Sequence, residues 1–284
     1  MKTKTSVIGT LAIVVLSAAI TASASPREKH SPYVQSVFEL VLNDGSRVYG
    51  QVEKEDGTEI LFRTTSGAAL RTPKARIVSM RPVLGRMVRG EFRREDPNDT
   101  RLAFGPTARS VGRGQAYLGV YQGIVPFVQV GVTDRFSIGG GTPLIFAFDD
   151  WDRPYWVSPK LQVYSGETAS AAVGLLHAFA GGESVGVGYA VFTKERPGGA
   201  FTLGTGIAYS SDGVAGAVAM VGGEVPVRRN IKFITENYVW DSTFVTSGGV
   251  RFFGERLAAD LVIAVAVTQG TAFAFPVVNF VYRF

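Results

Sequence analysis

The feature that most constrains this chain is an alternation of bulky residues with small or polar ones, which begins near residue 100 and persists to the end. In 201–209 the odd positions hold Phe, Leu, Thr, Ile and Tyr, whereas the even positions hold Thr, Gly, Gly and Ala. In 257–267 the odd positions are again apolar, and Asp260 lies on the opposite face. Successive side chains of a strand point to opposite faces, so this period of two predicts a long series of β-strands.

The second face of these strands indicates the environment in which they fold. A soluble sandwich buries its bulky face and exposes a polar one, but here the second face is mostly Gly, Ala and Ser. A barrel in a bilayer is the reverse, because its apolar face points outward and its small or polar face points into the lumen. We therefore predict an all-β protein with a transmembrane antiparallel β-barrel over 100–284.

Helices do not offer an alternative route across a membrane for the predicted barrel region. After the N-terminal segment no apolar run approaches the roughly 18 residues that a transmembrane helix needs. Yet 46% of the residues are hydrophobic, with 34 glycines and 19 phenylalanines. A chain that is apolar overall but never continuously apolar suits alternating strands.

We expect about twelve strands in this barrel. An even number places both ends of the barrel in the periplasm, as in bacterial single-chain barrels. The second segment is either one long strand or a hairpin that turns at Gln122-Gly123. The predicted strands are 100–108, 115–132, 134–146, 155–165, 168–180, 184–195, 199–210, 214–224, 230–240, 243–253, 256–267 and 271–284.

The last strand carries the most specific signal. Its alternate positions are apolar and end on aromatic residues, the last three being Phe280, Tyr282 and Phe284. This ending resembles the insertion signal of bacterial outer-membrane barrel proteins, and the resemblance implies recognition by the barrel-insertion machinery.

A second resemblance covers the first third of the predicted barrel. Its motifs are DPNxTRLxFxPTAR, which begins at Asp96 and ends at Arg109, and GVTDR at 131–135. These stretches are similar to uncharacterised outer-membrane β-barrel proteins of Gram-negative bacteria. The resemblance implies location and architecture, and it carries no assigned activity.

The N-terminus has the pattern of an export signal. Lys2 and Lys4 precede an apolar run from Ser6 to Thr21, and Ala22-Ser23-Ala24 is an A-x-A cleavage site. We expect a signal peptide over 1–24. A membrane anchor is the alternative, although the run is short for a transmembrane helix. Together with the barrel, this signal predicts a location in the bacterial outer membrane, with the N-terminal domain in the periplasm.

Between the signal and the barrel, residues 34–83 predict a small periplasmic β domain. Two Asp-Gly turns, at 44–45 and 56–57, separate short β-rich runs and are strong hairpin signals. Five strands in so short a segment suggest an SH3-like or Sm-like fold, which serves many functions. The expected strands are 37–42, 47–52, 59–64, 69–72 and 77–83.

Residues 84–99 form a basic linker in this interpretation. The wider stretch 71–94 carries eight Arg or Lys residues against one acid, Glu91. It is either a solvated connector or a contact with anionic lipid or an envelope polymer. The whole chain has a formal net charge of +5, two of which come from Lys2 and Lys4. This excess is too small to indicate a nucleic acid partner.

The sequence offers little for catalysis. With no cysteine in the chain, a thiol nucleophile and a thiolate metal site are excluded. Of the two histidines, His30 lies in the lead-in, and His177 shares the outward parity of its strand. We therefore predict neither an enzyme, nor a cofactor, nor a metal site. A lipid-modifying enzyme that uses His177 is the least favoured alternative.

Charged and polar residues on the inward face are the candidate site. A two-residue turn at Asp241-Ser242 pairs Trp240 with Thr243, Glu236 with Ser247 and Lys232 with Arg251. The two cations would repel each other, and we expect Glu236 and Asp260 to relieve this. The lumen-lining candidates are Lys160, Gln162, Tyr164, Lys232, Glu236, Arg251, Asp260, Asn279 and Arg283.

The opposite wall is expected to be small. Its inward residues are predicted to be Ser170, Ala172, Gly174, Gly186, Gly188, Gly204, Gly206 and Gly216. Long charged side chains either fill the space above this wall or line a water-filled path for small ions or solutes.

These alternatives lead to two principal functions. The first is a non-enzymatic barrel that anchors the small β domain, with outer-membrane lipid and a periplasmic envelope component as partners. The second is a narrow channel for small ions or solutes.

Overall fold

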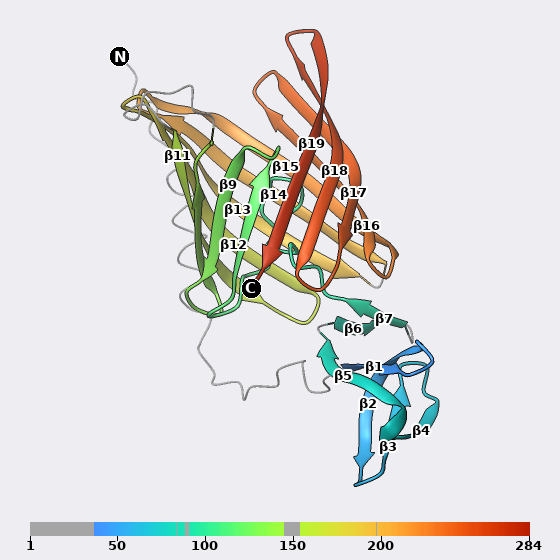
Figure 1. The fold of residues 1–284 in the computed structure, drawn as a ribbon. Coiled ribbons are helices and arrows are strands. Elements are labelled where there is room, and N and C mark those ends of the chain that lie inside the picture. The colour runs from blue at the N-terminus through green and yellow to red at the C-terminus, as the bar shows by residue number, and fades with distance from the viewer. Residues whose placement is uncertain (1–36, 84, 89–90, 145–153, 197) are drawn as a thin grey trace, which may run out of the picture. The chain divides into compact units, whose positions relative to one another are not determined.

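The computed structural model describes residues 37–83, 85–88, 91–144, 154–196 and 198–284. Within them the regular elements are β-strands and one short 3₁₀ turn, Lys74–Arg76 (Figure 1). No helix in these ranges is long and apolar enough to span a membrane. The predicted signal peptide, the lead-in with His30 and most of the outer loop after residue 144 lie outside the described residues.

Twelve antiparallel strands close into a barrel in which each strand pairs with its neighbours in sequence, and β19 pairs with β8 to complete the ring (Figure 1). Strands β12 to β19 have 10 to 16 residues, which is enough for a tilted strand to cross the roughly 30 Å hydrocarbon core. The barrel strands are β8 (Ala116–Tyr121), β9 (Val125–Gly131), β10 (Phe136–Gly141), β11 (Tyr155–Ser165), β12 (Ala169–Ala180), β13 (Glu183–Arg196), β14 (Gly199–Ser210), β15 (Gly213–Arg228), β16 (Ile231–Trp240), β17 (Thr243–Phe253), β18 (Leu257–Thr268) and β19 (Thr271–Arg283).

The predicted all-β class and the number of barrel strands are confirmed, but the first predicted strand was wrong, and the second segment is two strands. Residues 100–108 are not a strand, and the barrel begins at Ala116. The segment 115–132 is the hairpin alternative, β8 and β9. Its turn has positive φ angles of 53° at Gln122 and 71° at Gly123, the conformation that a two-residue turn needs to match the twist of its strands.

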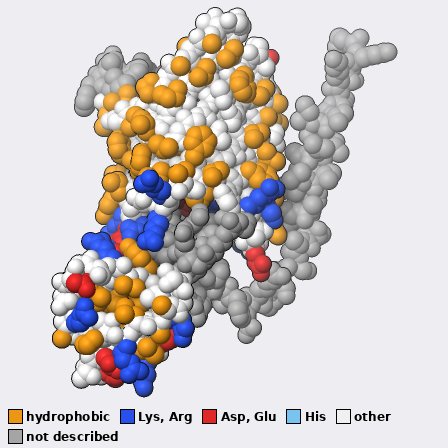
Figure 2. Space-filling model, turned by 90° about the vertical axis from the view of Figure 1, so that its right-hand side faces the viewer, with side chains coloured by type: hydrophobic (Ala, Val, Ile, Leu, Met, Phe, Trp, Pro, Cys, Tyr) orange, Lys and Arg blue, Asp and Glu red, His pale blue; other side chains and the backbone are white. Residues whose placement is uncertain are grey.

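The outer surface of the barrel is apolar, as the alternation predicts. Figure 2 shows hydrophobic side chains spread over one face, with few charged side chains among them. The outward positions of β14 and β18 include Leu203, Ile207, Leu261 and Ile263, all of which are exposed. Such a surface is unfavourable in water and favourable against lipid chains. Phe280, Tyr282 and Phe284 of the proposed insertion signal are also exposed.

In β13 the inward and outward faces are the reverse of our prediction. Tyr189 pairs with Gly174, and Val191 is buried beside Ala172 in an apolar cluster inside the barrel. The glycines of β13, Gly186 and Gly188, therefore face outward. A Cβ at Gly186 would lie 2.5 Å from the ring of Tyr209, so this glycine gives room to an aromatic side chain on the outer surface.

The N-terminal sheet has five antiparallel strands in the order β4-β3-β2-β1-β5. They match the predicted segments closely, and both Asp-Gly turns lie between strands. Their apolar core is Leu40, Leu42, Ile60 and Phe62. The strands are β1 (Val37–Leu42), β2 (Arg47–Glu55), β3 (Glu59–Thr64), β4 (Ala69–Pro73) and β5 (Ile77–Val83), and a separate two-stranded ladder follows with β6 (Gly85–Val88) and β7 (Glu91–Arg94).

The basic stretch is partly neutralised within this sheet. Arg71, Lys74 and Arg76 form ion pairs with Glu59, Glu55 and Asp44. These pairs are exposed and each contributes little to stability, but they leave less free positive charge for an anionic surface than the sequence suggests.

A buried carboxylate holds the sheet together at Glu39, which is only 1% exposed. The hydroxyl of Tyr49 donates to it over 2.7 Å and the Nε of Arg81 over 2.8 Å. Burial by itself raises the pKa of Glu39, but the hydrogen bonds from Tyr49 and Arg81 outweigh it and hold the pKa below its usual value. The charged form is therefore the one that stabilises the sheet.

Replacing Glu39 with Gln should destabilise the sheet by about 1.5–3 kcal/mol, because two charge-assisted hydrogen bonds are weakened. The effect can be measured in the full-length protein as lost hydrogen-exchange protection in β1 and β5. Because the folded pKa is lowered, wild-type protection should persist above the unfolded pKa and fall as the pH drops through the folded one.

The matched control is Glu53→Gln, since Glu53 forms a surface ion pair with Arg63. This change should alter stability by less than about 1 kcal/mol. Equal effects of the two substitutions on the exchange of β1 would contradict the role assigned to Glu39.

Candidate functional site

A segment that precedes the barrel in sequence lies inside it. We call residues 95–112 the plug. Leu102, Ala103, Ala108 and Val111 of the plug are almost completely buried. The plug folds back on itself, since the N–H of Leu102 donates to the carbonyl of Gly105 and that of Thr107 to Thr100, over 2.9 and 3.0 Å.

Turn-forming residues explain why the plug is not a strand. Asp96 begins the sequence Asp-Pro-Asn-Asp, and its Oδ1 accepts the N–H of Asn98 over 2.8 Å. Such Asx turns compete with extended structure. Pro106 has no N–H to donate to a ladder. The alternating apolar residues of 100–108 suggested a strand, but these turn signals prevail.

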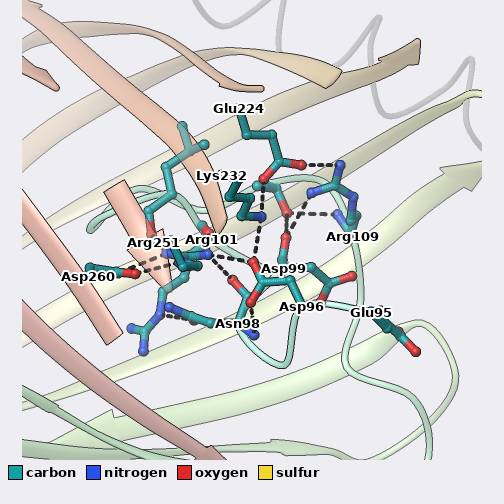
Figure 3. Close-up of polar contacts among 12 residues, drawn as sticks. Glu95, Asp96, Asn98, Asp99, Arg101, Arg109, Glu224, Lys232, Arg251 and Asp260 are labelled. Atoms are coloured by element: carbon teal, nitrogen blue, oxygen red, sulfur yellow. Dashed lines mark hydrogen bonds and ion pairs between the residues drawn. The ribbon is translucent and has the colours of Figure 1, made fainter. Parts of the chain in front are cut away.

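Arg251 on β17 is the centre of the contacts that hold the plug. Its side chain is fully buried and forms a two-bond ion pair with Asp260 on the adjacent strand β18 (Figure 3). It reaches Asp96 of the plug at 3.0 Å. It also donates to the carbonyl oxygens of Asn98 and Leu102, over 2.6 and 2.7 Å.

Lys232 on β16 forms the second attachment. It is ion-paired with Asp96 of the plug and with Glu224 on β15 (Figure 3). Glu224 in turn pairs with Arg109 of the plug at 2.6 Å, and Arg109 also reaches Glu195 on β13 at 3.0 Å. The charges of wall and plug therefore alternate in sign through these contacts, and Arg251, Lys232 and Arg109 each have two carboxylate partners.

The repulsion expected between Lys232 and Arg251 is relieved differently from our prediction. The two residues do face each other in the predicted register, and Asp260 does pair with Arg251. Asp96 contacts both cations, whereas Glu236 accepts the N–H groups of Phe104 and Gly105 over 3.0 and 2.9 Å.

The remaining predicted lumen residues also meet the plug. The ammonium of Lys160 donates to the carbonyl oxygens of Thr100, Thr107 and Arg109, and Gln162 donates to that of Ala108. Asn279 donates to the carbonyl of Ala103 over 2.9 Å, and Arg283 lies 3.6 Å from Glu95. Tyr164 is the exception: a bulge after Gln162 pairs it with Ala171, which puts it on the outward face.

Sequence reasoning missed Asp96, Arg101, Arg109, Glu195 and Glu224. The first three were assigned to a linker or a strand, and no periodicity marks them. Glu224 was detectable, because it shares the parity of Met220 and Gly222, whose partners Gly204 and Thr202 lie on the inward face of β14.

Among the described residues, two adjacent spaces lie beside the plug, toward the end of the barrel opposite Phe284. The larger has a volume of about 320 Å³, and its wall includes Arg101, Tyr121, Trp156, Lys160, Ala178 and Tyr189. The smaller, of about 180 Å³, is apolar and lies against Gly204, Gly206 and Met220. Phe104, Pro106, Leu176 and Tyr189 line both.

Arg101 differs from Arg109, the other cation of the plug. Its Nε donates to Asn98, and one terminal nitrogen donates to the hydroxyl of Tyr121. Its guanidinium carbon lies 3.9 Å from the ring centre of Phe127, a favourable cation–π contact. Its second terminal nitrogen, Nη2, is buried and has no hydrogen-bond partner among the described residues.

His177 lies on the outside of the barrel, on the predicted face. Its Nδ1 is 2.7 Å from the hydroxyl of Tyr209, and its ring contacts Phe179 edge-on. It has no carboxylate partner among the described residues. The same ranges contain no group of three or more His, Asp or Glu residues placed to hold a metal ion.

The closed antiparallel barrel with an apolar exterior and a polar lumen is the architecture of outer-membrane β-barrel proteins, and it places this chain in that membrane. No family model and no curated protein matches the chain. The resemblance drawn from the plug and GVTDR motifs stays a prediction.

Solved structures with a similar fold include porins. A KdgM porin, determined in complex with disordered oligogalacturonate, is 7% identical with a TM-score of 0.46, covering 60% of this chain and 98% of its own. A NanC porin is 9% identical with a TM-score of 0.40, over 60% and 97%. An anion-selective porin from Comamonas acidovorans is 14% identical with a TM-score of 0.33, over 88% and 99%.

Replacing Arg251 with Met should loosen the plug by about 3–5 kcal/mol, because Asp260 loses its buried partner and Asp96 keeps only Lys232. The chain has no cysteine, so Ala103→Cys introduces a unique thiol at a buried position that packs against Ile234 and Val262. Its labelling by a membrane-impermeant maleimide should be slow in the parent protein and at least about tenfold faster with Arg251→Met.

Lys194→Met is the matched control, because this lysine contacts Thr168 and lies on the outward face of β13. It should leave the labelling rate unchanged. Retained heat-modifiable migration in gels will show that the barrel itself is folded in each variant. Equal labelling with and without Arg251 would contradict the proposed attachment.

Proposed function

We propose that this protein is an outer-membrane channel for small solutes in which the plug is the gate. The observation that carries the proposal is that the plug attaches to the wall through side chains and leaves unfilled space beside it. Within the described residues, the backbone-to-backbone hydrogen bonds of 95–111 are internal to the plug. Its displacement would therefore leave every bond between neighbouring strands intact.

The distribution of polar contacts supports a gate at one end of the lumen. Lys232, Arg251 and Asp260 lie near the ends of their strands that are closest to Arg283, the end of the barrel. Trp156 and Ala178, which line the larger space, lie near the opposite end. A solute entering from that opposite end would meet the space first and the charged attachment of the plug afterwards.

A barrel with a purely structural role has no need of this arrangement. Its own wall side chains could fill a narrow lumen, whereas here the wall is small at Gly204 and Gly206 and a separate segment occupies the centre. The alternative function, an anchor for the five-stranded sheet, is favoured by the complete burial of Arg251 and its pairing with two carboxylates. The two functions differ in whether the plug moves.

Planar bilayers test this difference directly. The wild-type protein should show small, infrequent openings, and deletion of 95–112 should produce large, stable ones, because the lumen then holds no segment. Wild-type protein that stays silent at every voltage, while the deletion variant conducts, would establish the anchoring role instead.

Neutralising the predicted lumen charges tests the mechanism of gating. Because Lys232 is paired with Asp96 and Glu224, Lys232→Met should raise the frequency of opening about tenfold or more by releasing the plug. Lys194→Met should have no effect. A change in ion selectivity at unchanged opening frequency would show that Lys232 lines an open path rather than holding a gate.

A further inference from the structure

We propose that the larger lumenal space is a binding site for a small aromatic carboxylate, with the carboxylate at Arg101 and the ring among the surrounding aromatic side chains. This inference names the solute class of the proposed channel. It rests on the proposed function only for transport, because binding can be measured whether or not the protein conducts.

The first argument is the unsatisfied guanidinium. Arg101 is 7% exposed, and it has no ion-pair partner among the described residues, in contrast to Arg109 and Arg251. Figure 3 shows its side chain directed away from the acidic cluster around Asp96. A buried donor without an acceptor is unfavourable, and a carboxylate oxygen is the acceptor that a guanidinium binds most strongly.

The second argument is the local charge. Lys160 also lines the space, and its ammonium is held by three backbone carbonyls with no carboxylate in ion-pair distance among the described residues. Glu236 is turned toward the N–H groups of Phe104 and Gly105 and the hydroxyl of Tyr238. Arg101 and Lys160 therefore both contribute to the wall of this space, and basic side chains in a wall favour an anion over a neutral solute.

The third argument concerns the shape and chemistry of the walls. A volume of about 320 Å³ is at the small end of ligand sites, which range from roughly 300 to 1,000 Å³. Phe104, Tyr121, Trp156 and Tyr189 provide flat apolar surfaces. Two polar side chains of the wall already have partners, because Thr100 bonds to Tyr117 and Gln129 donates to Ser137. An aromatic ring suits such walls better than a polyhydroxylated ring, whose hydroxyls would lack partners.

Tryptophan fluorescence provides the test. The chain has three tryptophans, so Trp151→Phe with Trp240→Phe leaves Trp156 as the single reporter in the wall of the space. Benzoate should change its emission saturably, and neutral benzamide should bind at least about tenfold more weakly, because it lacks the charge that Arg101 requires.

Two variants separate the parts of the proposal. Arg101→Met should weaken benzoate at least about tenfold and leave benzamide unchanged, and unchanged labelling of Ala103→Cys will show that the plug is still seated. Ala178→Phe should abolish binding of both by filling the space, without touching Arg101. Benzoate binding that is unaffected by both variants, or no saturable response in the parent protein, would overturn the site.

Two further outcomes concern the solute class and transport. Tighter binding of glucuronate than of benzoate would overturn the assignment to aromatic acids. Saturable benzoate binding without solute flux into proteoliposomes would leave the site standing and refute the channel. Solute flux without benzoate binding would refute the site and leave the channel standing.

Discussion

The interior of this barrel depends on one carboxylate, Asp96, which lies between two cations that the strand register forces together. Lys232 and Arg251 are cross-strand partners on the inward face of β16 and β17, and like charges in this position repel. Arg251 is fully buried, and an unpaired buried charge is strongly destabilising. Each cation has one carboxylate on the wall, Asp260 for Arg251 and Glu224 for Lys232, and Asp96 of the plug is the anion that the two cations share. The shared ion pairs link a segment that precedes the barrel in sequence to β16 and β17 near its end.

The plug also explains why the lumen is not uniformly polar. Ala108 packs against Ala172, Val191 and Met220, while Ala103 packs against Ile234 and Val262. An occupied lumen has a hydrophobic core of its own, so apolar residues appear on inward positions wherever the plug touches the wall. Polar residues appear where its carbonyl and N–H groups need partners, as at Lys160 and Glu236.

These two effects set the limits of prediction from sequence. The outward faces of β14, β18 and β19 were predictable, because each of these strands has only one bulky, apolar face. The pairing of Lys232 with Arg251 was predictable from a two-residue turn. The face of β13 that points outward was not predictable, because Val191 and Tyr189 can pack against a plug in the lumen as well as against lipid. The outward position of Gly186 is explained only by the ring of Tyr209. The plug was hidden because its apolar spacing imitates a strand, although Asp96 and Pro106 mark turns.

The order of segments along the chain has a mechanical consequence. The five-stranded sheet is followed by β6 and β7, and the plug begins at the next residue after Arg94. Tension applied to the sheet would therefore travel along the backbone to Asp96 before it reached any strand of the barrel. The first contacts to bear that load are the ion pairs of Glu95 with Arg283 and of Asp96 with Lys232 and Arg251. These ion pairs would pass the load to β16, β17 and β19 before the backbone carried it to β8.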